Sequence, residues 1–74
     1  MADLLAMAVR DAQNKHAESL RSGDDRSILI AYINALEAER ALFLDGGGLA
    51  DVEAAAQIGF QIEDERAVLA GLAA

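Results

Sequence analysis

Apolar side chains recur along this chain every three or four residues. The first stripe of this kind contains Leu5, Val9, Ala12, His16 and Leu20. This interval places side chains on one face of an α-helix, whereas a half-buried strand would need apolar and polar residues to alternate. The chain has no proline and is rich in helix-forming Ala, Leu, Glu and Arg. The pattern therefore predicts helix and nowhere favours a strand.

Two further stripes follow. The middle segment has a broad apolar face, with Ile30 at its edge: Ile28, Leu29, Tyr32, Ile33, Leu36, Phe43 and Leu44. The last segment has a narrower stripe padded by alanines: Ala55, Ile58, Ile62, Leu69 and Leu72. Because the middle segment is the most apolar, we expect it to be the central element of the fold.

Glycine-rich breaks separate the three segments. Gly23 ends the first helix, and either Ser22 or Asp24 serves as the N-cap of the next. The run Gly46-Gly47-Gly48 ends the second helix and allows the chain to reverse. We therefore predict helices at about 3–21, 25–44 and 50–71. Short links favour antiparallel neighbours, which gives one all-α domain, 1–74, folded as a small three-helix up-down-up bundle.

The apolar residues are too few for a large core. Hydrophobic residues make up 54% of the chain, but seventeen of them are alanine. Only twenty-three large apolar side chains are therefore available to the core of a 74-residue chain. A chain this short needs further stabilisation, and it has no cysteine for a disulfide and only one histidine. We therefore expect self-association, most simply a homodimer, or a partner chain to complete the bundle.

The net charge of −7 disfavours binding to nucleic acid or to anionic membranes. No run of residues approaches the roughly 18 apolar residues of a membrane span. The N-terminus lacks the basic residues of a secretory signal, so we predict a cytoplasmic protein. Acidity leaves one alternative function open, an inhibitor or antitoxin-like protein that blocks a basic or nucleic-acid-binding partner.

No pattern typical of a metal site, a cofactor site or a catalytic centre occurs. Helical carboxylate metal sites use Glu-x-x-His, and His16 has no carboxylate three residues away on either side. The glycine run is followed by no Lys-Ser or Lys-Thr pair that would bind phosphate. No nucleophile with an accompanying base is recognisable. We therefore predict no metal, no cofactor and no enzymatic activity.

Two arginines lie close to the apolar stripes of their helices. Arg40 and Arg66 occupy matching places in two similar segments, 36–42 and 62–68. Each segment has an apolar residue followed by Glu-x-Glu-Arg-Ala, and we call this similarity the internal echo. Each guanidinium either reaches solvent or pairs with Glu37 or Glu63 three residues earlier on its own helix. Alternatively, it pairs with a carboxylate of another helix or chain.

Phe60 is the candidate anchor for a partner. It lies about 160° from Ile62 on a helical wheel, among small and polar residues. Large aromatic side chains with a polar rim are common interface anchors, although isolated exposed apolar residues are also ordinary. We predict a partner-binding surface made of Phe60, Ala56, Ala67, Arg40, Arg66 and Tyr32. The function expected is a non-catalytic protein–protein interaction or assembly module.

Overall fold

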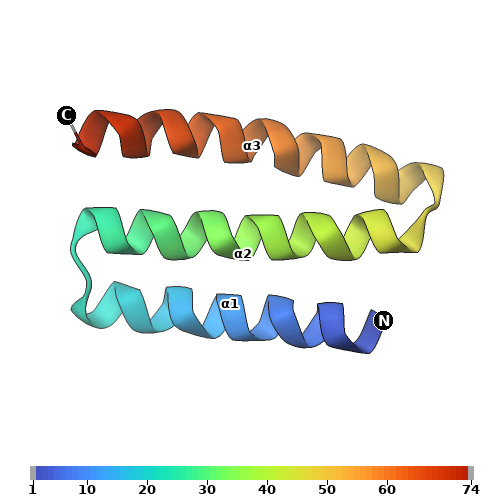
Figure 1. Ribbon diagram of the computed structural model, residues 1–74, viewed down its shortest axis with the longest axis horizontal. Coiled ribbons are helices and arrows are strands. Elements are labelled where there is room, and N and C mark those ends of the chain that lie inside the picture. Colours follow the sequence, from blue (N-terminus) through green and yellow to red (C-terminus); the bar gives the residue numbers. More distant parts are fainter. Residues whose placement is uncertain (1, 74) are drawn as a thin grey trace.

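The computed structural model describes residues 2–73 of the chain, which form three helices. The helices are α1 (Ala2–Ser22), α2 (Asp25–Gly46) and α3 (Leu49–Ala73), and each runs antiparallel to the one before it (Figure 1). The all-α, up-down-up prediction is confirmed, and each predicted helix end lies within two residues of the observed one.

The turn between α1 and α2 is held by a capping aspartate. Asp24 has extended backbone angles, and its carboxylate accepts a hydrogen bond of 2.8 Å from the backbone N–H of Ser27. Asp24, rather than Ser22, is therefore the N-cap of α2. Hydrogen bonds from the backbone and side chain of Ser27 hold the pKa of Asp24 below its usual value.

The turn between α2 and α3 requires one particular glycine. Gly47 caps the C-terminus of α2 with a φ of 72°, in the left-handed region that strongly favours glycine. No other described residue has a positive φ. The glycine run thus reverses the chain, as predicted.

The three helices lie side by side in a flat row with α2 in the middle (Figure 1). Among residues 2–73, no Cα atom of α1 comes within 8 Å of one in α3, and both helices pack only on α2. The principal-axis extents of 38 × 22 × 13 Å describe a slab that is longest along the helices and thinnest perpendicular to the row. Two broad faces of α2 therefore have no helix above them.

The core lies between α2 and α3. Ile33, Leu36 and Ile62 are buried there. The half-buried residues packed against this cluster are Leu29, Tyr32, Ile58 and Leu69. Ala35 and Ala55 are also buried, whereas none of residues 3–21 is.

Four residues assigned to the apolar stripes are exposed rather than packed inside. They are Leu20, Phe43, Leu44 and Leu72, with 37–61% of their surface accessible. A helix in a flat row has neighbours at its sides only, so a broad apolar face is not fully covered. None of the helices in the described part of the chain is long and apolar enough to cross a lipid bilayer.

Candidate protein-interaction surfaces

An apolar groove runs over the N-terminal half of α2. Its volume is about 440 Å³. Its floor is α2, and its walls are the C-terminal parts of α1 and α3, which lie on either side of α2 at the left end of Figure 1. The described residues that line this apolar groove are His16, Asp25, Ile28, Leu29, Tyr32, Val68 and Leu72. Of these, Asp25 alone carries a formal charge when histidine is neutral.

Tyr32 connects all three helices at the floor of the apolar groove. Its ring lies 5.1 Å from the ring of His16 on α1, with the two planes tilted by 38°. Its hydroxyl accepts a hydrogen bond of 2.5 Å from the side-chain amide of Gln61 on α3. The ring and the hydroxyl of Tyr32 therefore both have partners within the fold, an arrangement that favours a preorganised groove floor.

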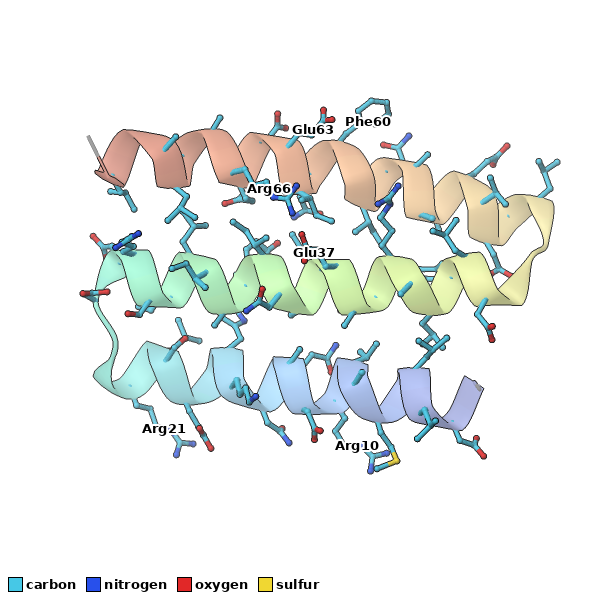
Figure 2. The ribbon with its side chains drawn as sticks, in the orientation of Figure 1. Arg10, Arg21, Glu37, Phe60, Glu63 and Arg66 are labelled. Carbon is cyan, nitrogen blue, oxygen red and sulfur yellow. The ribbon has the colours of Figure 1, made fainter. Side chains whose placement is uncertain are left out.

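A second, charged groove lies between α2 and α3 alone. Its volume is about 490 Å³. The described residues that line this charged groove are Glu37, Arg40, Ala41, Leu44, Ala56, Gly59, Phe60, Ile62, Glu63 and Arg66. Phe60 and Glu63 point away from α2 at the outer edge of α3, whereas Glu37 and Arg66 point toward each other (Figure 2).

Arg66 forms an ion pair with Glu37 across the two helices. This settles the choice left open by the sequence, since Arg66 pairs with a carboxylate of another helix rather than with Glu63. The Arg66 and Glu37 side chains are 60% and 43% exposed, so water screens the pair and it adds little to stability. Within residues 2–73 the structure shows no ion pair for Arg40, whose guanidinium lies beside Gly59.

The predicted partner-binding residues do not form one surface, and five of the six are divided between the two grooves. Arg40, Ala56, Phe60 and Arg66 come together in the charged groove. Tyr32 lies in the apolar groove, and Ala67 is exposed on α3 outside both linings. Phe60 is 63% exposed, as its position opposite Ile62 predicted.

Sequence reasoning missed the α3 wall of the apolar groove. Val68 and Leu72 are 54% and 48% exposed and lie one turn apart. Their spacing of four residues indicates a shared helix face. However, Leu72 also fits the main apolar stripe of its helix, and Val68 falls within the internal echo. Their shared wall became recognisable once α1 and α3 were placed on opposite sides of α2.

Within residues 2–73, no three His, Asp or Glu side chains are arranged to hold a metal ion. Comparison of the chain with protein families, with curated proteins and with solved structures gives no match.

Proposed function

We propose that this chain is a non-catalytic assembly module that works by associating with a second copy of itself. The main support is its accessible surface of 5093 Å². A folded monomer of 7.8 kDa is expected to expose about 4,400 Å². The surplus of about 700 Å² is close to the roughly 800 Å² that each partner buries in an interface of standard size.

The character of the surplus surface also supports association. Among the side chains that the structure describes, eleven large apolar ones are exposed by 37% or more, whereas five residues, two of them alanines, form the buried core. Burial of apolar surface is the dominant favourable term in most protein association. Covering one broad face of the helical row would give this chain the second layer that most folded domains have.

The lining of the apolar groove favours contact with another apolar protein surface. Four of its lining residues, Ile28, Leu29, Val68 and Leu72, have aliphatic side chains that make contacts without reacting. We therefore assign it to recognition of another protein surface.

The experiment is light scattering coupled to size exclusion, combined with thermal melting, from about 1 to 100 μM. A homodimer predicts a mass that doubles over this range and a melting temperature that rises with concentration, because dimer stability follows mass action. A monomer at 100 μM with concentration-independent melting would refute self-association.

Ionic strength distinguishes apolar assembly from the inhibitor alternative. Association through apolar surface should persist or strengthen as sodium chloride rises from 50 mM to 1 M, because salt screens the repulsion between two chains of charge −7. Binding to a basic partner should weaken over the same range. Loss of the dimer at high salt would therefore count against the assembly proposal.

A further inference from the structure

We infer that the self-association surface is the apolar groove, and that its occupant is the ridge formed by Val68 and Leu72 of a second copy. This inference rests on the proposed function. In a two-fold dimer the same patch serves both chains, so the ridge of each copy lies over Leu29 and Tyr32 of the other.

Charge selects the apolar groove over the charged groove. The two grooves differ in the number of ionised groups that a contact would remove from water, and a contact that buries few of them is favoured. The charged groove contains two carboxylates and two guanidiniums, and burying these would cost desolvation free energy that their pairing only partly returns. The apolar groove contains one carboxylate, Asp25, in the first turn of α2, where the helix dipole favours it.

Shape supports the same choice. The apolar groove has α2 as its floor and a wall on each side, because α1 and α3 lie too far apart to close over α2. A helix of a second copy laid on this face would complete a two-layer packing. Phe60, by contrast, lies at the outer edge of α3 and points away from α2 (Figure 2).

The experiment compares Val68→Asp with Phe60→Asp. The two variants add the same charge to the same helix at residues that are 54% and 63% exposed, so each is the matched control for the other. Val68→Asp should raise the dimer dissociation constant at least about a hundredfold, because it places an unpaired carboxylate in an apolar contact. Phe60→Asp should change it by less than about threefold. Circular dichroism at each concentration verifies that both variants remain helical.

Val68→Ala is the second variant, in case the aspartate disturbs the end of α3. Alanine keeps the helix and removes apolar contact alone. We expect the dissociation constant to rise about tenfold, as loss of a buried valine side chain implies.

Tyr32 provides an independent readout. It is the only tyrosine and the chain has no tryptophan, so emission excited at 280 nm reports on the floor of the apolar groove. Quenching by acrylamide should fall as the wild-type dimer forms, and should not depend on concentration in Val68→Asp. This readout follows the groove itself rather than the mass of the particle.

Each pattern of results has a distinct meaning. A dimer lost in Phe60→Asp and kept in both Val68 variants would assign the interface to the edge of α3 and overturn the inference. A dimer kept in all three variants would also overturn it while leaving the proposed function intact. A wild-type monomer at every concentration would overturn both.

Discussion

The two seams of the helical row are built differently. The seam between α2 and α3 contains the buried aliphatic cluster of Ile33, Leu36 and Ile62. On α1, by contrast, none of residues 3–21 is buried, and its contacts with α2 include the His16–Tyr32 ring contact and a hydrogen bond from Gln13 to Glu39.

Two helices can therefore lie close together without burying much apolar surface between them. Small residues on α2, including Ala31, Ala35 and Ala38, let α1 lie close while burying little apolar area per side chain. The aliphatic seam excludes more apolar surface from water. We therefore expect α2 and α3 to form the stable part of the fold, and α1 to open first.

The largest predicted effect tests this contrast directly. Ile62→Ala should destabilise the fold by about 2–5 kcal/mol, because it removes a side chain that is 4% exposed and leaves a cavity. That is a large part of the stability expected for a chain of this length. Urea unfolding followed by circular dichroism, at one fixed protein concentration, measures it.

Val9→Ala is the comparison on α1, and it removes one carbon fewer than Ile62→Ala. Val9 is only half-buried, so the loss should be about 1 kcal/mol or less. Equal losses from the two variants would show that the seams are equally strong. Amide exchange offers a second view, since α1 should lose protection before α2 and α3.

A smaller effect is expected at the corner that joins α1 to α2. Asp24→Ala should lower the melting temperature by a few degrees, because it removes the N-cap of α2. The pKa of Asp24 is lower in the fold than its ordinary value of 3.8. Its contribution is therefore complete above that value and is lost as the pH falls through the lower folded pKa.

Asp24→Asn keeps a side chain that can cap α2 but removes its negative charge. Asparagine also caps helices well, so this variant should stay close to the wild type at neutral pH and lose the pH-dependent part of the contribution. Melting of the wild type and both variants between pH 7 and pH 2 provides the comparison. A difference between the wild type and Asp24→Ala that grows as the pH falls would contradict this account.

The smallest effect is expected from the ion pair of the α2–α3 seam. A double-mutant cycle with Glu37→Ala and Arg66→Ala should give a coupling free energy of about 0.5 kcal/mol or less, because both side chains are substantially exposed. A value above about 1.5 kcal/mol would mean that the ion pair, and not only Ile62 and its neighbours, holds α3 in place.

The amino-acid pattern alone predicts the three helices, their ends to within two residues, and the position of Phe60 on the face of its helix opposite Ile62. These are local properties, because 3.6-residue periodicity, the capping aspartate and glycine each act within a few residues. The internal echo could not reveal whether Arg66 pairs with Glu63 or Glu37, since that depends on how two helices are aligned.

The arrangement of the helices in a row (Figure 1) follows from tertiary packing and could not be predicted from periodicity. Periodicity fixes which side chains share a face, but alanine is compatible with a packed seam and with a solvent-exposed surface alike. The pattern therefore does not identify the second packing face of α2. This face contains Ala31, Ala35, Ala38 and Leu42, which are all at least half-buried. Because α2 carries two packing faces on opposite sides, α1 and α3 stay apart, and the apolar groove exists between them.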